Sequence, residues 1–275
     1  MMRLFLNQLE ICMNNTLITI LGFFIIFIMT TLGASLVFFF KKDISQSVNS
    51  MLLGLAGGIM VAASIWSLII PSIDMSEATF GKFAWFPAAT SIIIGGLLLA
   101  LLDKIVPHMH NGTHQEEGPR SHFSKSMKLF FAVTLHNIPE GLAVGFAFGA
   151  AAVTGDTAAY ISALGLAIGI GIQNFPEGAA VSLPMKQVTG SSKKAFLFGM
   201  GSGVVEPLSA IVGFFLASHL IMLQPWLLAF SAGAMLFVVA EDLIPDANLS
   251  ENPHTGTWGF MIGFIIMMIL DVALG

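Results

Sequence analysis

The chain has 275 residues, of which 56% are apolar and 10% are charged, and its formal net charge is −5. This small number of charged side chains cannot cover the surface of a soluble globular protein. The composition therefore excludes an ordinary water-soluble protein and predicts an integral membrane protein. A single cysteine, Cys12, excludes an intramolecular disulfide and a thiolate metal cluster, so any bound metal must be held by nitrogen and oxygen ligands.

Apolar runs long enough to cross a bilayer, which takes roughly 17 to 25 residues, follow one another along the whole chain. The first run lacks the short apolar core and cleavage site of a signal peptide, so we expect it to remain in the mature protein. The sequence therefore predicts an all-α integral membrane protein with a single polytopic membrane domain over residues 1–275. The eight expected spans lie at about 17–40, 52–73, 86–106, 128–152, 158–185, 195–218, 225–245 and 257–274.

Lysine and arginine are distributed unevenly over the connections between these spans, with nine on one side and two on the other. Since cytosolic loops carry the excess of positive charge, we predict that both termini are extracytoplasmic and that the protein lies in the cell (inner) membrane. The longest connection, 107–127, is then cytosolic and carries four of the seven histidines. It is either a solvated polar loop or a weak metal contact near an exit.

Two stretches inside apolar spans are near copies of each other: His-Asn-Ile-Pro-Glu-Gly-Leu-Ala-Val at 136–144 and Gln-Asn-Phe-Pro-Glu-Gly-Ala-Ala-Val at 173–181. In a helix, each motif places a carboxylate, a carboxamide and a further donor within one turn. A lone Asn or Gln is often hydrogen-bonding glue between membrane helices, but the repeated pattern favours a metal site. The candidate ligands in the two motifs are His136, Asn137, Glu140, Gln173, Asn174 and Glu177.

Three carboxylates lie near the middle of consecutive spans: Glu140, Glu177 and Glu206. An unpaired charge at that depth costs at least ~2.5 kcal/mol, so three independent charges would be hard to retain. A shared divalent cation would remove this cost, and Glu206 is therefore a further candidate ligand. Gly141 and Gly178 follow the motif glutamates, and we expect them to let the two motif-bearing helices approach each other closely.

An internal echo suggests a repeated architecture. Gly58-Ile59-Met60 followed by Pro71 resembles Gly233-Ala234-Met235 followed by Pro245, which is either chance in Met-rich helices or the trace of an inverted repeat. An inverted repeat would arrange the eight transmembrane helices as 3+2+3, with the fourth and fifth spans as the central pair.

With its paired motifs, the chain resembles the ZIP family of divalent metal transporters, and within that family the bacterial, GufA-like branch. The resemblance covers nearly the whole chain. It implies a binuclear site in which Glu140 and Glu177 bridge two ions, His136 and Gln173 complete one, and Asn137, Asn174 and Glu206 complete the other. It also implies an elevator-like motion, in which spans one, four, five and six carry the site past spans two, three, seven and eight.

Zinc is the expected cargo, moved into the cytoplasm. Many members of the family have a second histidine where this chain has Gln173, which is a harder and weaker donor. Because ligand type and geometry set metal selectivity, cadmium, iron, manganese and cobalt remain candidate substrates.

Routes to and from the site follow from spacing. Met60, Ser67 and Asp74 recur every seven residues, so we expect them to share a face that is either an entry path or a packing surface. Asp271, near the outer end of the last span, is interpreted as interfacial. Residues expected to receive the ion at the cytosolic ends are Asp103, His108, His110, Glu241 and Asp242.

Two other classes of function stay open. An intramembrane metal-dependent hydrolase would also bury His and Glu, but the chain has no His-Glu-x-x-His motif, so no enzyme activity is expected. A metal-sensing membrane protein would bind ions without moving them. The expected partners are divalent metal ions and the lipid bilayer, with a homodimer as a candidate assembly and no nucleic acid.

Overall fold

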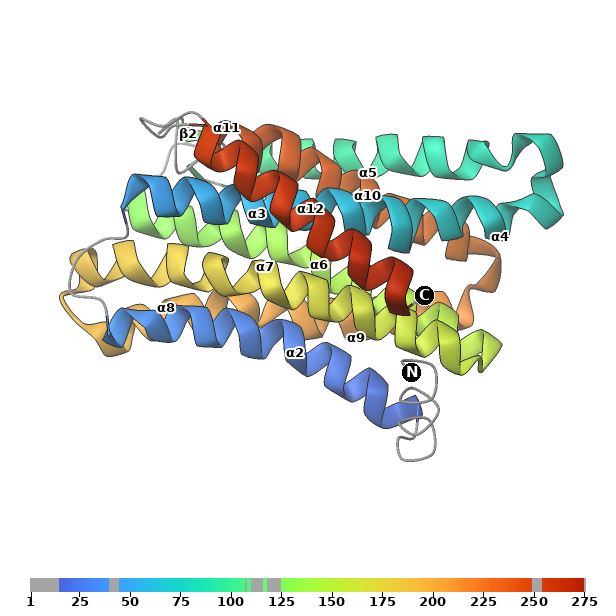
Figure 1. Cartoon of the computed structure of the whole chain (residues 1–275), viewed down its shortest axis with the longest axis horizontal. Helices are drawn as coiled ribbons and strands as arrows, with labels where there is room; N and C mark the ends of the chain where they lie inside the picture. The colour runs from blue at the N-terminus through green and yellow to red at the C-terminus, as the bar shows by residue number, and fades with distance from the viewer. Residues whose placement is uncertain are drawn as a thin grey trace.

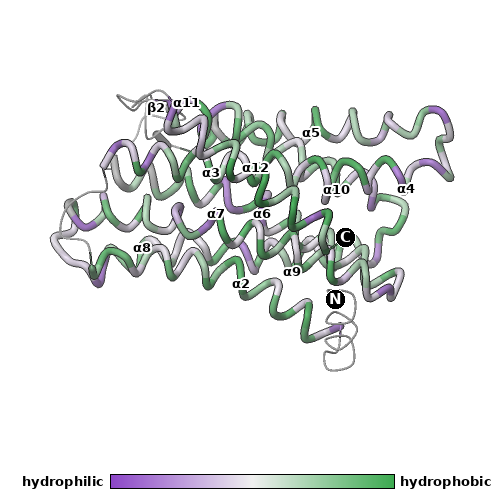
Figure 2. Tube along the Cα trace, viewed as in Figure 1, coloured by the Kyte–Doolittle hydropathy of each residue, from purple (hydrophilic) through white to green (hydrophobic). Residues whose placement is uncertain are grey.

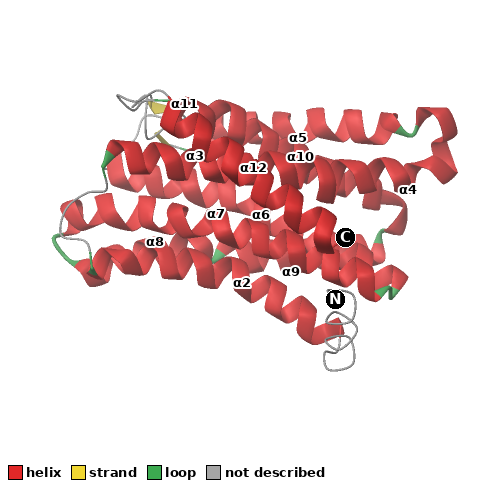
Figure 3. Cartoon of the chain, viewed as in Figure 1, coloured by secondary structure: helices red, strands yellow, loops and turns green. Residues whose placement is uncertain are grey.

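A computed structural model describes residues 15–39, 45–106, 108–109, 116–117, 125–248 and 254–274. Nearly all of these residues are helical (Figure 3), and the long helices run roughly side by side along one direction (Figure 1). The α-helices are α2 Asn15–Ser35, α3 Gln46–Ala63, α4 Ile70–Phe80, α5 Trp85–Ile105, α6 Lys125–Thr154, α7 Thr157–Thr189, α8 Ser192–Gly203, α9 Val205–His219, α10 Gln224–Val238, α11 Ile244–Ala247 and α12 His254–Leu274.

Shorter elements join these helices. Two-residue strands β1 (His108–Met109) and β2 (Glu116–Glu117) pair antiparallel within the long connection 107–127, for which no strand was predicted. The 3-10 turns are η1 Leu36–Phe38, η3 Gly81–Phe83 and η4 Ile221–Leu223, and the π-helical segments are η2 Ser64–Ile69 and η5 Val239–Leu243.

Within the described residues, seven helical stretches are long and apolar enough to cross a membrane. They are Asn15–Phe38, Gln46–Phe83, Trp85–Leu102, Thr157–Lys186, Ser192–His219, Ile221–Ala247 and His254–Leu274. This confirms the prediction of a helical membrane protein, and each stretch overlaps a predicted span. The remaining predicted span, 128–152, lies on α6, which is 30 residues long and packs against α7, α9 and α10.

Hydrophobic residues predominate along the long helices (Figure 2), and many of their large apolar side chains are exposed. Phe24 on α2, Leu97 on α5 and Val272 on α12 are each more than half exposed. Such a surface would be unfavourable in water but is suited to contact with lipid.

The second stretch extends beyond the predicted span 52–73 at both ends, and a π-helical segment precedes the proline within it. η2 lies between α3 and α4, and Pro71 follows it; η5 lies between α10 and α11, and Pro245 follows it. A proline removes a backbone donor and ordinarily kinks a helix, whereas a π turn already departs from the regular hydrogen-bond pattern. Each segment follows one half of the Gly-x-Met echo, so the two regions correspond in structure as well as in sequence.

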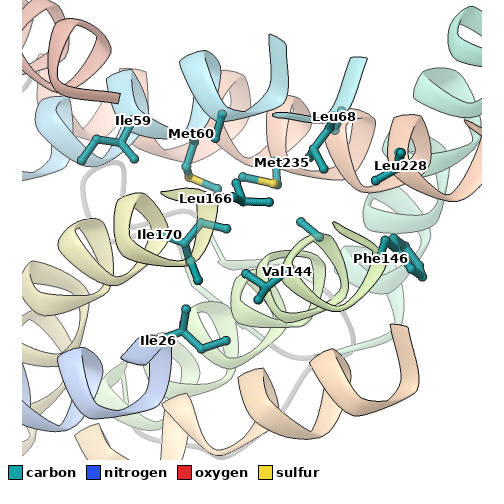
Figure 4. Close-up of a cluster of buried hydrophobic side chains, with 14 of the residues drawn as sticks. Ile26, Ile59, Met60, Leu68, Val144, Phe146, Leu166, Ile170, Leu228 and Met235 are labelled. Carbon is teal, nitrogen blue, oxygen red and sulfur yellow. The ribbon is translucent and has the colours of Figure 1, made fainter. Parts of the chain in front are cut away.

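The helices pack in two groups (Figure 1). The first group contains α2, α6, α7, α8 and α9, and the second contains α3, α4, α5, α10 and α12. Contacts of α6 with α10, and of α7 with α3 and α12, join the groups. The junction is filled by buried apolar side chains, and Figure 4 shows Met60 and Met235 of the second group beside Leu166 of the first.

Close approach between helix backbones depends on glycine at specific positions. In α5, a Cβ on Gly95 would lie 2.1 Å from the carbonyl oxygen of Phe230 on α10. A Cβ on the adjacent Gly96 would meet only side-chain atoms of Phe237, at 3.6 Å, which is an ordinary contact distance. The close approach of α5 to α10 therefore requires glycine at position 95 but not at position 96.

We predict that Gly95→Ala lowers the free energy of unfolding by about 1 to 3 kcal/mol, because α5 must move away from α10. Gly96→Ala is the matched control, since it changes helix propensity equally without a backbone clash. Thermal melting of the purified protein in detergent, followed by circular dichroism, measures both. Equal melting temperatures for the two variants would contradict the proposed backbone contact.

Candidate metal centre

The predicted ligands come from three neighbouring helical segments. His136, Asn137 and Glu140 lie in the middle of α6, and the second motif lies in the equivalent part of α7. Glu206 lies in the first turn of α9, directly after a break at Val204 that separates α8 from α9. The predicted span 195–218 is therefore two helices, because Gly201, Gly203 and Pro207 weaken the regular hydrogen-bond ladder at this point.

Hydrogen bonds connect these segments through carboxamide donors. Gln173 Nε2 donates to Glu140 Oε1 over 2.7 Å, which joins α7 to α6. Asn174 Nδ2 donates to Glu206 Oε2 over 2.8 Å, which joins α7 to α9. Asn137 Nδ2 donates to the Ser202 carbonyl oxygen over 3.0 Å, beside the α8–α9 break. The structure thus brings both motifs and Glu206 into one buried polar region.

Burial makes this polar region energetically demanding. Asn137, Glu140, Gln173, Asn174 and Glu206 have no exposed surface, and Glu177 is 9% exposed. Glu140, Glu177 and Glu206 place three carboxyl groups in this one buried region. Buried charge of one sign is unfavourable unless it is paired or coordinates a metal.

Five buried side-chain oxygens in this region have no hydrogen-bond partner among the described residues. They are Asn137 Oδ1, Glu140 Oε2, Gln173 Oε1, Asn174 Oδ1 and Glu177 Oε2. Each carboxamide uses its nitrogen as a donor, so its oxygen is the atom left over. Because all five atoms are acceptors, the region is suited to a cation and unsuited to an anion.

A preformed cluster of charged ligands is absent from the described part of the chain. No three His, Cys, Asp or Glu side chains come together there closely enough to hold a metal ion by themselves. A cation bound in this region would therefore need carboxamide oxygens among its ligands, or a rearrangement of the carboxylates.

One predicted exit residue lies beside a predicted ligand. Asp242 Oδ2, in η5 of the second helix group, is 3.1 Å from His136 Nε2 in the first. Glu241 is exposed and is not part of this contact. His110 lies outside the described residues, as do the side chains of Asp103 and His108, so those three positions stay predictions.

The predicted entry residues do not share one environment. Met60 is fully buried in the junction, whereas Asp74 is exposed. Ser67 lines a cavity of about 200 Å³ between η2, α6, α7 and α10, whose wall continues to Pro71 and Met75. The π-helical η2 lies between Met60 and Asp74 and alters the rotation of the helix, so a seven-residue spacing no longer marks a single face.

Two contacts in the structure were not anticipated from the sequence. Ser67 Oγ donates to Asp271 Oδ1, so Asp271 is a buried residue that packs against η2 rather than an interfacial one. Thr30 Oγ1 on α2 donates to Glu206 Oε1 over 2.8 Å. The heptad spacing assigned Ser67 to an entry path or a packing surface and did not connect it with Asp271, and nothing in the sequence marks Thr30.

The prediction for Gly141 and Gly178 was wrong about which helices they bring together. A Cβ on Gly141 would lie 2.3 Å from the Glu206 carbonyl oxygen, so this glycine admits α9. A Cβ on Gly178 would lie 2.0 Å from the Thr30 carbonyl oxygen, so this one admits α2. The direction in which a glycine faces depends on the rotation of its helix, which the sequence alone did not reveal.

Comparisons with known proteins find similar sequences over most of the chain. A family model described as ZIP zinc transporter matches residues 122–271. The zinc transporter ZIP11 of Homo sapiens is 35% identical over 333 aligned positions, which cover 93% of this chain and 97% of the relative. ZIPB of Bordetella bronchiseptica is 36% identical, with 90% and 79% covered, and GufA of Myxococcus xanthus is 33% identical, with 85% and 90% covered; both are named zinc transporters.

A divalent cation such as zinc, added at about 100 times its dissociation constant, is expected to stabilise the protein by about 2.7 kcal/mol, because it binds only the folded state. The double variant Glu140→Gln/Glu177→Gln should lose most of this stabilisation. Thermal melting in detergent, with and without the cation, tests the prediction. Glu77→Gln, at an exposed carboxylate on α4, is the control and should respond as the wild type does; an undiminished shift in the double variant would contradict the prediction.

Proposed function

This chain belongs to the ZIP zinc transporter family, and we propose that it moves divalent metal cations, zinc foremost, across the membrane into the cytoplasm. Family membership makes it a multi-pass membrane transporter rather than an enzyme. The observation that carries the proposal is the set of five unpartnered acceptor oxygens on α6 and α7. Their burial is unfavourable without a cation, which makes a permanent structural role for them costly.

We propose a binuclear site, supported by the division of the hydrogen bonds into two clusters. Gln173 and Glu140 pair in one cluster, together with the nearby His136. Asn174 pairs with Glu206 in the other, and Asn137 contacts the adjacent Ser202 carbonyl oxygen. Glu140 and Glu177 would bridge two ions about 3.5 to 4 Å apart, as in other two-metal sites.

The packing of the helices supports an elevator-like mechanism. The predicted ligands all belong to the group of α2, α6, α7, α8 and α9, and that group meets the other across a mainly apolar junction. An apolar junction offers few directional bonds, so one group can slide along the other without losing many of them. The contact of His136 with Asp242 crosses this junction and would have to break during the movement.

Eight membrane crossings in a 3+2+3 order remain our proposal for the topology. The beginning of α2 and the end of α12 lie at the same end of the bundle (Figure 1), as an even number of crossings requires. Lys186 lies in the last turn of α7, and Lys193 and Lys194 lie in the first turn of α8, so all three flank the α7–α8 connection. Lys82 lies in η3, between α4 and α5. This charge asymmetry supports extracytoplasmic termini in the inner membrane.

Transport is tested by zinc uptake into proteoliposomes that contain a zinc-sensitive dye. We expect the wild type to take up zinc and Glu177→Ala to reduce the initial rate at least tenfold, because it removes a proposed bridging ligand. Glu77→Ala serves as the control at an exposed site. Zinc binding by the wild type without flux would instead identify a metal sensor. Only hydrolysis of a substrate by the purified protein would support the enzyme alternative.

Metal selectivity is tested by Gln173→His. An imidazole nitrogen is a softer and stronger ligand for zinc than a carboxamide oxygen, so we expect uptake of zinc relative to manganese to rise severalfold. Competitive uptake of zinc, cadmium, iron, manganese and cobalt, in wild type and variant side by side, measures the change. An unaltered order of preference would show that Gln173 is not a direct ligand.

A further inference from the structure

We propose that Thr30 is a positioning residue for Glu206, the proposed ligand that follows the α8–α9 break. This inference rests on the proposed function and extends it to α2, a helix that carries none of the predicted ligands. Thr30 is fully buried, and its hydroxyl group is the part of α2 that contacts the ligand carboxylate.

The carboxylate of Glu206 is held on both of its oxygens. Thr30 Oγ1 donates to Oε1 from α2, and Asn174 Nδ2 donates to Oε2 from α7, each over 2.8 Å. Two donors on opposite oxygens fix the plane of the carboxylate as well as its position. Each carboxylate oxygen can accept more than one interaction, so both remain able to bind a cation.

The hydroxyl of Thr30 has a second acceptor within its own helix. Its Oγ1 lies 3.1 Å from the carbonyl oxygen of Ile26, four residues earlier. A hydroxyl has one proton, so it can donate to Ile26 or to Glu206 but not to both at full strength. When Glu206 shifts to accommodate an ion, the hydroxyl can return to Ile26 without leaving a buried donor unpaired. The contact can therefore be made and broken reversibly.

Glycines on the neighbouring helices leave room for Thr30. A Cβ on Gly178 of α7 would lie 2.0 Å from the Thr30 carbonyl oxygen, and one on Gly203 of α8 would lie 2.8 Å from Thr30 Cγ2. The methyl group of Thr30 thus occupies the space that Gly203 leaves free, while the hydroxyl faces Glu206. Two functions, packing and hydrogen bonding, are carried by two separate groups of one side chain.

This separation allows the two functions to be tested independently. Thr30→Val keeps the branched shape and removes the donor, whereas Thr30→Ser keeps the donor and removes the methyl group. Thr30→Ala lacks both, so comparison of Ser with Ala measures the hydroxyl again if the valine variant does not fold. Thr31→Val is the matched control, because the Thr31 hydroxyl donates to the Phe27 carbonyl oxygen over 2.8 Å in the same way.

Zinc KM and maximal rate are measured in proteoliposomes, and zinc affinity is measured by calorimetry on the detergent-solubilised full chain. We expect Thr30→Val to raise KM and Kd about 10-fold or more, the usual effect of removing a hydrogen bond to a metal ligand. Thr30→Ser should stay within about threefold of wild type, and Thr31→Val should be unchanged. In a Glu206→Ala background, Thr30→Val should have little further effect, because that background removes the acceptor of the Thr30 hydroxyl.

The outcomes separate this inference from the proposed function. Zinc affinity that is the same in Thr30→Val and wild type would overturn the positioning role and leave the transport proposal intact. Equal losses in the valine and serine variants, or full additivity with Glu206→Ala, would show a packing role and also overturn it. Wild-type protein that binds zinc without flux would overturn the transport proposal alone. Absence of zinc binding by the wild type would overturn both the transport proposal and the positioning role of Thr30.

Discussion

The structure depends on how buried acceptors are satisfied by donors from neighbouring helices. Glu140 and Glu206 each receive a carboxamide N–H from α7, and Glu206 also receives the hydroxyl of Thr30. Each carboxamide that donates in this way leaves its own oxygen unpartnered. A region built from carboxylates and carboxamides therefore ends with a surplus of acceptors, and a cation is the chemical species that removes such a surplus.

Small residues make these polar contacts geometrically attainable. Side chains as short as Asn and Thr bridge two helices only if the backbones lie close together, and Gly141 and Gly178 permit that approach toward α9 and α2. The break at Val204 then presents the Ser202 carbonyl oxygen to Asn137. Helix packing and ligand placement are thus parts of the same arrangement, and a change in one alters the other.

The junction between the two helix groups is mainly apolar, unlike the polar region around the proposed ligands. It is dominated by buried apolar side chains such as Met60, Leu166 and Met235 (Figure 4), with few polar contacts across it. One of these contacts joins Ser231 Oγ to the Pro139 carbonyl oxygen over 3.2 Å, and another joins His136 to Asp242. Both lie next to the motif of α6, so the proposed ligands are in direct contact with the group past which they would move.

The sequence by itself determined the membrane class, most span positions and the candidate ligands, because hydropathy and motif spacing are local properties of the chain. It did not determine which helices Gly141 and Gly178 face, or that the second helical stretch would contain the π-helical segment η2 and extend to Phe83. Nor did it indicate that Thr30 would contact Glu206, 176 residues away. Only the tertiary structure decided these points, because the rotation of each helix and the choice of its neighbour result from packing over its whole length.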